Sequence, residues 1–274
     1  MITFDAVRLK GLTDINLPII GLSAKDPYRV TAIDGLGPPE LEVLLAETHA
    51  PGGIYINRRA QGREIVIRLG LNPDYRIGQT IADLRYALYG LLSTGVDSRD
   101  QSVKCQLMEN NVVVVETSGY VKRIEIVPFD KKPQAQITIA CLGPYLNRPA
   151  ATDYKGYMGG SYFTVSNAGL APTGVELNVK FLASLSNFTI NISGGSAMTF
   201  EGPFEVDDIL VVDTNEATRF VGLLRNDEYV KYMEMLTPES DWIGLHGGDH
   251  DVQYSDPWAI EWLYFRYHER FWGI

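Results

Sequence analysis

The 274-residue chain is 45% hydrophobic and 21% charged, a composition typical of a globular protein and not of a disordered or fibrous one. Its 24 basic and 34 acidic side chains give a formal net charge of −10, which argues against tight binding of duplex DNA, because neutralising phosphates takes clustered positive charge. No apolar run reaches the ~20 residues of a membrane span, and the first residues, MITFDAVRLKGLTD, lack the pattern of a secretory signal peptide. We therefore expect a protein made in the cytoplasm that makes no membrane contact.

Charge is distributed unevenly along the chain. Residues 1–150 hold 17 basic and 16 acidic side chains, whereas residues 151–274 hold 7 basic and 18 acidic ones. Either a neutral half packs against copies or partners while an acidic half faces solvent, or two domains simply differ in composition. The stretch 143–160, which contains Gly and Pro and no sustained alternation, lies at the same point. We predict two domains, 1–150 and 151–274.

Alternating apolar and polar residues predict antiparallel strands in most of the first half. Gln61-Gly62 lies between two such runs in GIYINRRAQGREIVIRLGL, so residues 53–71 are predicted to form a β-hairpin. Asn110 and Asn111 can adopt the positive φ of a tight turn. They predict a second hairpin from residues 102–108 and 112–118, and another strand pair follows at 119–129 and 136–146.

One segment of the first half has helical spacing instead. Its apolar residues recur three or four positions apart, as on one face of a helix, at Ile81, Leu84, Leu88, Leu91 and Leu92. Thr80 is a suitable N-cap, Asp83 brings negative charge to the first turn, and Gly95 is placed to end the helix. The pattern predicts a helix over 80–95.

The second half is predicted to be a β-sandwich. About ten short alternating segments follow residue 160 at the spacing typical of that architecture. Residues 225–236 fit helical spacing only loosely, so strand and turn are favoured there. Cys105 and Cys141 lie on apolar faces of their segments and are interpreted as buried free thiols, with one bridge between neighbouring strands left open.

Two polar clusters have the residue types of a functional site. His246, Asp249, His250 and Asp251 are metal-ligand types, but Gly247-Gly248 between them indicates a turn, so we predict a surface loop and no metal. The second cluster consists of Glu201, Glu205, Asp207 and Asp208. It could supply the carboxylate pair of a glycoside hydrolase or form a solvated turn, and we favour the turn.

The sequence contains no GxSxG, HExxH, P-loop or GxGxxG motif, and we predict no catalytic residue and no cofactor. Aromatic residues crowd the last strand, where Trp258, Trp262 and Trp272 lie. Such rings fill a core or an interface, or form a platform for stacking sugars.

The order of these elements resembles that of the distal tail proteins of long non-contractile-tailed, siphovirus-type bacteriophages. Val165-Ser-Asn-Ala-Gly-Leu-Ala-Pro-Thr173 is similar to the N-x-G-x-x-P-T start of the sandwich in that family. Residues 240–250, from Ser240 through Leu245 to His250, are similar to its S-x-x-x-L-x-x-G-x-N turn, with one residue more between Ser240 and Leu245 and with His250 in the place of the family's Asn.

The resemblance implies a mainly β fold. Its N-terminal part is a split β-barrel-like, ring-forming belt domain with one α-helix, and its C-terminal part is a galectin-like antiparallel β-sandwich. It also implies a structural virion protein of the tail tip and baseplate that is not an enzyme. A homohexamer forms a ring at the distal end of the tail tube, joins the tube to the tail-tip hub and leaves a channel through which DNA passes without specific binding.

The partners implied are further copies of the chain, the tail tube protein, the tail-tip hub or tail-associated protein, and a receptor-binding or side-fibre protein. For ring closure we single out Tyr55, Asn57 and Arg63 on the first hairpin and the outward helix side at Arg85 and Tyr89. Two alternatives stay open: a carbohydrate-binding, host-adhesion sandwich module and a β-sandwich glycoside hydrolase.

Overall fold

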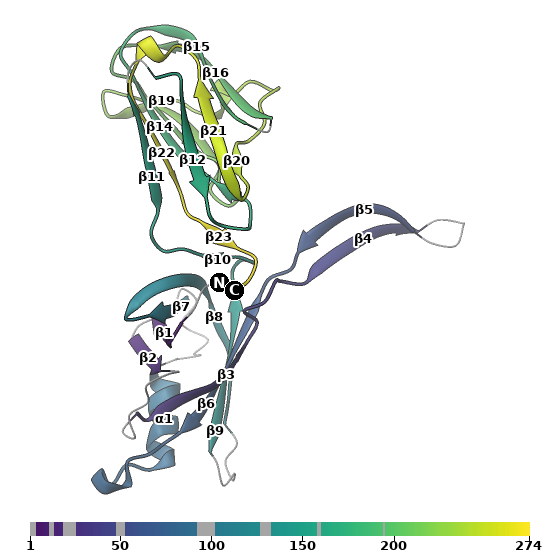
Figure 1. The fold of residues 1–274 in the computed structure, drawn as a ribbon, viewed down its shortest axis with the longest axis vertical. Helices are drawn as coiled ribbons and strands as arrows, with labels where there is room; N and C mark the ends of the chain where they lie inside the picture. The colour runs from purple at the N-terminus through teal and green to yellow at the C-terminus, as the bar shows by residue number, and fades with distance from the viewer. Residues whose placement is uncertain are drawn as a thin grey trace. The chain divides into compact units, whose positions relative to one another are not determined.

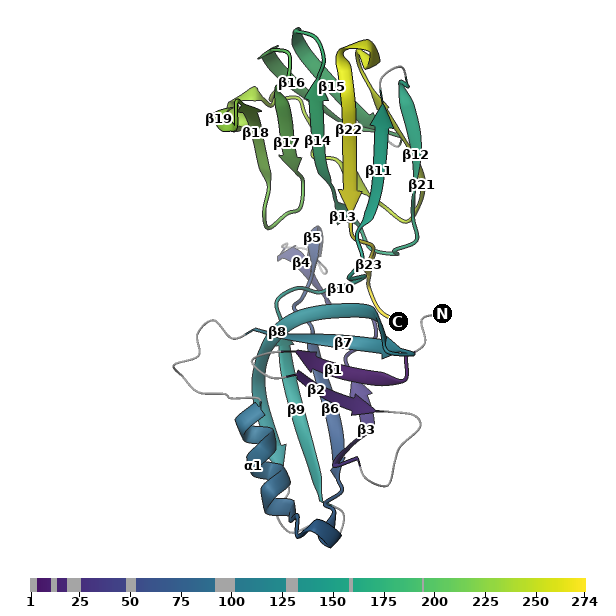
Figure 2. The same cartoon turned by 90° about the vertical axis from the view of Figure 1, so that its left-hand side faces the viewer.

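The computed structural model describes residues 4–10, 14–18, 26–47, 53–91, 102–126, 133–157, 160–193 and 195–274. The chain divides into two compact units, unit 1 (Met1–Pro149 with Phe271–Ile274) and unit 2 (Ala150–Arg270) (Figures 1 and 2). The chain therefore passes between the units twice, and its last four residues are part of unit 1. None of the helices in the described ranges is long and apolar enough to span a bilayer.

Unit 1 is built on a nine-stranded antiparallel sheet whose main path runs β2-β1-β7-β8-β9-β6-β3, with β10 and β23 paired beside it. Its strands are β1 (Ala6–Lys10), β2 (Asp14–Pro18), β3 (Tyr28–Asp34), β6 (Glu64–Leu71), β7 (Val103–Glu109), β8 (Val112–Ile126), β9 (Gln134–Cys141), β10 (Leu146–Asn147) and β23 (Arg270–Phe271). Within the described residues no ladder joins β2 to β3, so the sheet stays open and is not a closed barrel. The predicted mainly β, split architecture is confirmed.

Alternation along the strands places the core of unit 1 on one face of this sheet. In β6, Ile65, Ile67 and Leu69 are almost fully buried, while Glu64 and Arg68, which alternate with them, are exposed. Helix α1 (Ile81–Leu91) covers this face with Leu84 and Leu88, which belong to the same buried cluster. A 3-10 turn, η1 (Tyr75–Ile77), precedes the helix.

The start of α1 is capped as the sequence predicts. The Asp83 backbone N–H donates to the Thr80 hydroxyl (3.2 Å), and the Thr80 backbone N–H donates to the Asp83 carboxylate (2.7 Å). This reciprocal pair satisfies donors that the first helical turn leaves without partners. The predicted helix is confirmed over Ile81–Leu91, and the predicted end at Gly95 lies outside the described residues.

The predicted hairpin over 53–71 is wrong. Strand β5 (Gly53–Ala60) pairs with β4 (Leu41–Glu47) in a separate two-stranded ribbon, whereas β6 pairs with β3 and β9. Gln61 does not begin a tight turn, because its N–H donates to the Glu40 carbonyl at the base of the ribbon (2.8 Å). The chain leaves the ribbon there and enters the sheet.

The turn predicted at Asn110-Asn111 is confirmed. Both residues have positive φ, 50° and 65°, and they connect β7 to β8, which pair antiparallel. Asn adopts a positive φ at a lower cost in free energy than most residues. A two-residue hairpin turn requires positive φ at both of its residues. Strand β8 then pairs with β9, as the sequence predicts. Cys105 on β7 and Cys141 on β9 are free thiols on strands separated by β8.

Unit 2 is the predicted two-sheet antiparallel sandwich. One sheet runs β11-β22-β14-β17-β18-β19, the other β12-β21-β15-β16, and β13 pairs with β20. Its strands are β11 (Thr152–Tyr157), β12 (Tyr162–Asn167), β13 (Thr173–Gly174), β14 (Glu176–Phe181), β15 (Leu185–Ile192), β16 (Ser196–Phe204), β17 (Ile209–Asp213), β18 (Phe220–Arg225), β19 (Glu228–Lys231), β20 (Gly244–Leu245), β21 (Gly248–Tyr254) and β22 (Ile260–Tyr267), with 3-10 turns η2 (Met233–Met235) and η3 (Pro257–Ala259). Residues 225–236 are strand and turn, as predicted.

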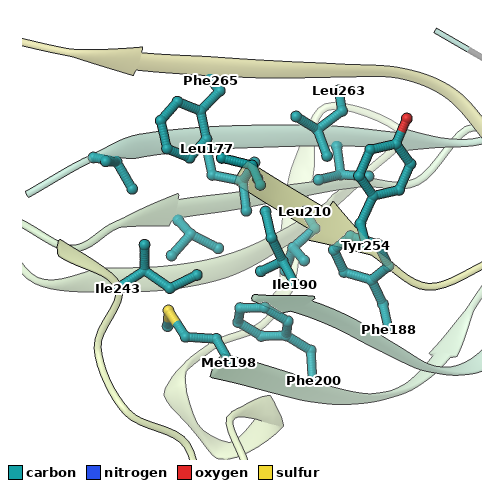
Figure 3. Close-up of a cluster of buried hydrophobic side chains, with 14 of the residues drawn as sticks. Leu177, Phe188, Ile190, Met198, Phe200, Leu210, Ile243, Tyr254, Leu263 and Phe265 are labelled. Atoms are coloured by element: carbon teal, nitrogen blue, oxygen red, sulfur yellow. The ribbon is translucent and has the colours of Figure 1, made fainter. Parts of the chain in front are cut away.

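The core of unit 2 lies between these two sheets. Leu177 and Leu263 from the larger sheet lie against Phe188 and Ile190 from the smaller one (Figure 3). Phe181 contacts Phe188 edge-to-face, with ring centroids 5.7 Å apart. Such aromatic contacts add to the free energy gained by removing the rings from water, so the sandwich supplies a rigid base for the groups on its outer faces.

Candidate functional site

The β4–β5 ribbon, named here the arm, exposes large apolar side chains. Seven of them are 40% to 64% exposed, namely Leu41, Val43, Leu44, Leu45, Ile54, Tyr55 and Ile56. The arm pairs with no other described strand, and two strands without a covering layer are marginally stable in water. An apolar surface of this kind is typical of a segment that binds another chain.

The register of the arm distributes these side chains over two faces. Leu41, Val43 and Leu45 alternate on one face of β4, and Tyr55 lies opposite Leu45 on the neighbouring strand. On the other face, Arg59 forms an ion pair with Glu42 (2.6 Å). The first face of the arm is therefore mainly apolar, with Arg58 opposite Val43, and the second face is mixed.

A register shift between Leu44 and Leu45 separates two of the predicted interface residues. Tyr55 lies opposite Leu45 and Asn57 lies opposite Leu44. Since Leu44 and Leu45 are consecutive residues, Tyr55 and Asn57 are on opposite faces. Tyr55 is 56% exposed, whereas the Asn57 side chain accepts a hydrogen bond from the Arg58 N–H (2.8 Å).

Arg63, the third residue predicted on this segment, is only 4% exposed. Its guanidinium donates hydrogen bonds to the carbonyls of Gly35 (2.8 Å), Pro144 (2.9 and 3.1 Å) and Trp272. Burial lowers the pKa of Arg63. Arg63 thus joins the base of the arm to two other segments of unit 1.

The helix carries a second exposed surface of unit 1. Tyr89, predicted from the sequence, is 45% exposed, and Arg85 is half-buried. Two further exposed side chains were not predicted from the sequence: Tyr86, which is 78% exposed, and Ile77 in η1, which is 76% exposed. Both lie outside the apolar stripe of α1. Tyr86 could have been predicted from the sequence, because a bulky aromatic residue outside the buried face of a helix indicates an exposed contact surface.

In unit 2, three of the four residues of the acidic cluster form ion pairs, namely Glu205, Asp207 and Asp208. Asp208 is 1% exposed and accepts two hydrogen bonds from Arg225 (2.7 and 2.8 Å). The same guanidinium contacts Glu205 (2.9 Å), and Lys180 contacts Asp207 (3.0 Å). These carboxylates hold a turn between β16 and β17 and are not arranged as an open pair in a cleft.

The histidine cluster forms a turn and the start of β21. His250 Nε2 lies 2.9 Å from the carbonyl of His246, and Gly248 between them has a φ of 112°. In the ranges that the structure describes, no group of three or more His, Cys, Asp or Glu side chains could hold a metal ion.

The two sequence motifs similar to those of phage tail proteins meet in space. Asn167 is buried, its amide donates to the carbonyls of Leu245 (3.4 Å) and His246 (3.0 Å), and its oxygen accepts the N–H of Gly169 (2.9 Å). A Cβ on Gly169 would lie 2.5 Å from the carbonyl oxygen of Arg270, so this position requires glycine. The N-x-G spacing thus has a structural cause: one side chain connects two loops of unit 2.

Comparison with known proteins agrees with this arrangement. Residues 168–271 match the family of siphovirus-type tail components, C-terminal domain. The crystal structure of SPP1 Dit (gp 19.1), described as a paradigm of the hub adsorption apparatus in phages that infect Gram-positive bacteria, is similar over 97% of this chain and 99% of its own, at 17% identity and a TM-score of 0.66. A structure of the phage P2 baseplate in its activated conformation with Ca is more distant, at 9% identity and a TM-score of 0.43 over 96% of this chain and 97% of its own.

No curated protein matches the chain. The resemblance to siphovirus distal tail proteins is confirmed by the family match in unit 2 and by the fold of the whole chain.

Proposed function

We propose that this protein is a structural hub at the distal end of a phage tail. The proposal is supported by the match of residues 168–271 to the siphovirus-type tail components and by the similarity of the fold to that of SPP1 Dit. Six copies form a ring in the virion. The ring joins the tail tube to the tail-tip hub or tail-associated protein, and DNA passes through its centre.

The observation that carries the proposal is the uncovered apolar face of the arm. This face is lined by Leu41, Val43, Leu45 and Tyr55. Covering these side chains with another surface removes apolar area from water, which is favourable in free energy. A head-to-tail contact between identical copies uses two different surfaces, and it closes into a ring when the rotation between copies divides a full turn. The arm of one copy covers unit 1 of the next in this proposal.

The exposed helix surface is the second element of the proposed interface. Tyr86, Tyr89 and Ile77 are aromatic or apolar and exposed, and aromatic residues are enriched at protein interfaces. Residues 1–150 have a net charge near zero, which keeps the Coulomb cost of bringing copies of unit 1 together low. The proposed interface therefore keeps Tyr55 and Tyr89, adds Tyr86, and omits Arg63.

The remaining partners follow from the position at the tail tip. A receptor-binding or side-fibre protein contacts unit 2, and assembly takes place in the host cytoplasm. DNA crosses the channel without specific binding. The protein has no catalytic role in this proposal, since Glu205, Asp207 and Asp208 of the acidic cluster are held in ion pairs with Arg225 and Lys180.

The test is the mass of the full-length protein in solution, measured by light scattering and native mass spectrometry. Six copies of the 30.5 kDa chain give about 180 kDa. The double variant Val43→Glu, Leu45→Glu places two charges on the apolar face of the arm and is expected to give folded monomers. The matched control Leu170→Glu, Val206→Glu changes two exposed apolar residues of unit 2 and should keep the ring.

Three results would contradict the proposal. The first is a wild-type protein that stays monomeric or dimeric both in solution and in electron micrographs of intact particles. The second is an arm variant that assembles like the wild type. The third is loss of the ring in the control alone.

A further inference from the structure

A pocket of about 400 Å³ opens on the outer face of the six-stranded sheet of unit 2. Its lining residues are Lys155, Asn178, Trp262, Leu263 and Tyr264. Tyr264 on β22 lies opposite Lys155 on β11 and opposite Asn178 on β14. These three residues therefore form a row across three neighbouring strands.

The row faces solvent because the alternate residues face the core. Leu177 and Val179 on either side of Asn178 are buried, as are Leu263 and Phe265 on either side of Tyr264. Trp262 precedes Tyr264 by two residues and so lies on the same face. Two aromatic rings, an amide and an ammonium group are thus held on a rigid sheet.

A network of ion pairs fixes the Tyr264 side chain. Arg266 donates to the Tyr264 hydroxyl (2.6 Å) and to the Asp153 carboxylate (2.8 Å). The Arg266 hydrogen bond is the main cause that lowers the pKa of Asp153, so this carboxylate stays ionised at neutral pH. Asp153 is held by Arg266 and is not an acid or base available to a ligand.

Two polar groups of the pocket have no such partner. In the described part of the chain nothing hydrogen-bonds the Asn178 amide, which both donates and accepts. The Lys155 ammonium lies 5.7 Å from the centroid of the Tyr264 ring and forms no ion pair with a described carboxylate. These groups are therefore available to a ligand on the sheet surface.

We propose that this pocket binds a pyranose ring of a saccharide. The apolar C–H face of the sugar packs against Trp262, as apolar groups pack against aromatic rings. Neighbouring sugar hydroxyls bond the Asn178 amide, and the Lys155 ammonium donates to a further hydroxyl. The volume is that of a small-ligand site, and the net charge of −11 over residues 151–274 disfavours phosphate-rich polymers such as nucleic acid.

The test uses the full-length protein and a printed panel of bacterial surface saccharides, including oligomers of N-acetylglucosamine, rhamnose, glucose and galactose. Saturation-transfer NMR then gives the affinity for the sugar that binds best. Trp262→Ala and Asn178→Ala are each expected to weaken binding about tenfold or more, the loss of about 1.4 kcal/mol. Thermal unfolding of each variant confirms that it is folded.

Two control variants match these changes outside the pocket. Trp258 on η3 is 59% exposed, and Asn191 is half-buried on β15 of the other sheet. Trp258→Ala and Asn191→Ala should bind like the wild type. The proposal is overturned if no saccharide of the panel binds, if a folded Asn178→Ala or Trp262→Ala protein binds like the wild type, or if a control variant loses binding as strongly. Ring assembly is measured separately and does not enter this result.

Discussion

The guanidinium of Arg63 donates a hydrogen bond to the backbone carbonyl of Trp272, which is 209 residues away in the sequence. The Trp272 ring packs against Tyr145, with centroids 4.9 Å apart. The next residue, Gly273, lies so close to the loop before β4 that a Cβ would be 2.7 Å from the carbonyl carbon of Gly37. Arg63 thus holds the last residues of the chain in unit 1.

Replacing Arg63 with Met should lower the free energy of unfolding of unit 1 by about 3 kcal/mol. The change removes the hydrogen bonds that a charged donor makes to three backbone carbonyls, those of Gly35, Pro144 and Trp272. Urea unfolding measures the loss, and hydrogen exchange should show faster exchange in residues 271–274. Arg68→Ala is the control, because Arg68 is 48% exposed and its ion pair with Asp34 contributes less than about 1 kcal/mol. Equal losses in the two variants would contradict the role of Arg63.

Removing the Asp208 carboxylate should destabilise unit 2. Asp208→Ala leaves Arg225 without its two-point partner and the Glu205 N–H without the acceptor that it contacts at 2.7 Å. Breaking one side of a buried charge pair costs about 3 kcal/mol. Asp207→Asn, which removes the charge of a 75% exposed carboxylate and keeps a residue type that tolerates the φ of 69° at this position, should cost less than about 1 kcal/mol. Thermal unfolding of both variants checks the difference, and a mild Asp208→Ala phenotype would contradict it.

The cap of α1 should make stability depend on pH in the acid range. Hydrogen bonds from the Thr80 side chain and backbone lower the pKa of Asp83 below 3.8. A carboxyl with a lower pKa in the folded state stabilises the fold above its unfolded pKa, and this contribution is lost as the pH falls through the folded value. The stability difference between wild type and Asp83→Asn should therefore shrink below about pH 4.

The same cap can be tested at neutral pH. Thr80→Ala should cost about 1 kcal/mol, while Thr80→Ser keeps the hydroxyl and should cost much less. Circular dichroism followed during urea unfolding measures both variants. Identical losses for Ala and Ser would mean that the hydroxyl does not cap the helix.

Cys105 should resist alkylation in the folded protein. Burial raises the pKa of its thiol to about 12, so the reactive thiolate is scarce at pH 8, where an ordinary cysteine is partly ionised. Iodoacetamide labelling followed by peptide mass spectrometry should modify Cys105 only after urea is added. Labelling of Cys105 in the native protein at the rate of a small free thiol would contradict its burial.

Elements that depend on neighbours in the sequence were predictable. The helix was found because its apolar spacing, its Thr80 cap and its first-turn Asp83 all lie within a few residues. The Asn110-Asn111 turn was found because two successive residues that tolerate positive φ have few other uses between apolar runs. Alternation likewise identified the sandwich strands, since one face of each is buried.

Partners distant in the sequence were not predictable. β5 could pair with the strand before it or the one after it, and Gln61-Gly62 suggested the latter, yet the ladder is formed with β4. Arg63 was assigned to the interface as a polar residue on an element that the family uses for ring closure, and only the position of Gly35, Pro144 and Trp272 explains its burial. The bulge that separates Tyr55 from Asn57 has no mark in the sequence either.

The return of residues 271–274 makes unit 2 an insertion within unit 1. The chain leaves unit 1 after β10 and re-enters it at β23, and these strands pair with each other. Paired strands are about 4.8 Å apart. A linker of one or two residues is therefore long enough to join the point where the chain leaves unit 1 to the point where it returns. Recombination at these two points can exchange the whole sandwich for another module without disturbing the sheet that receives it.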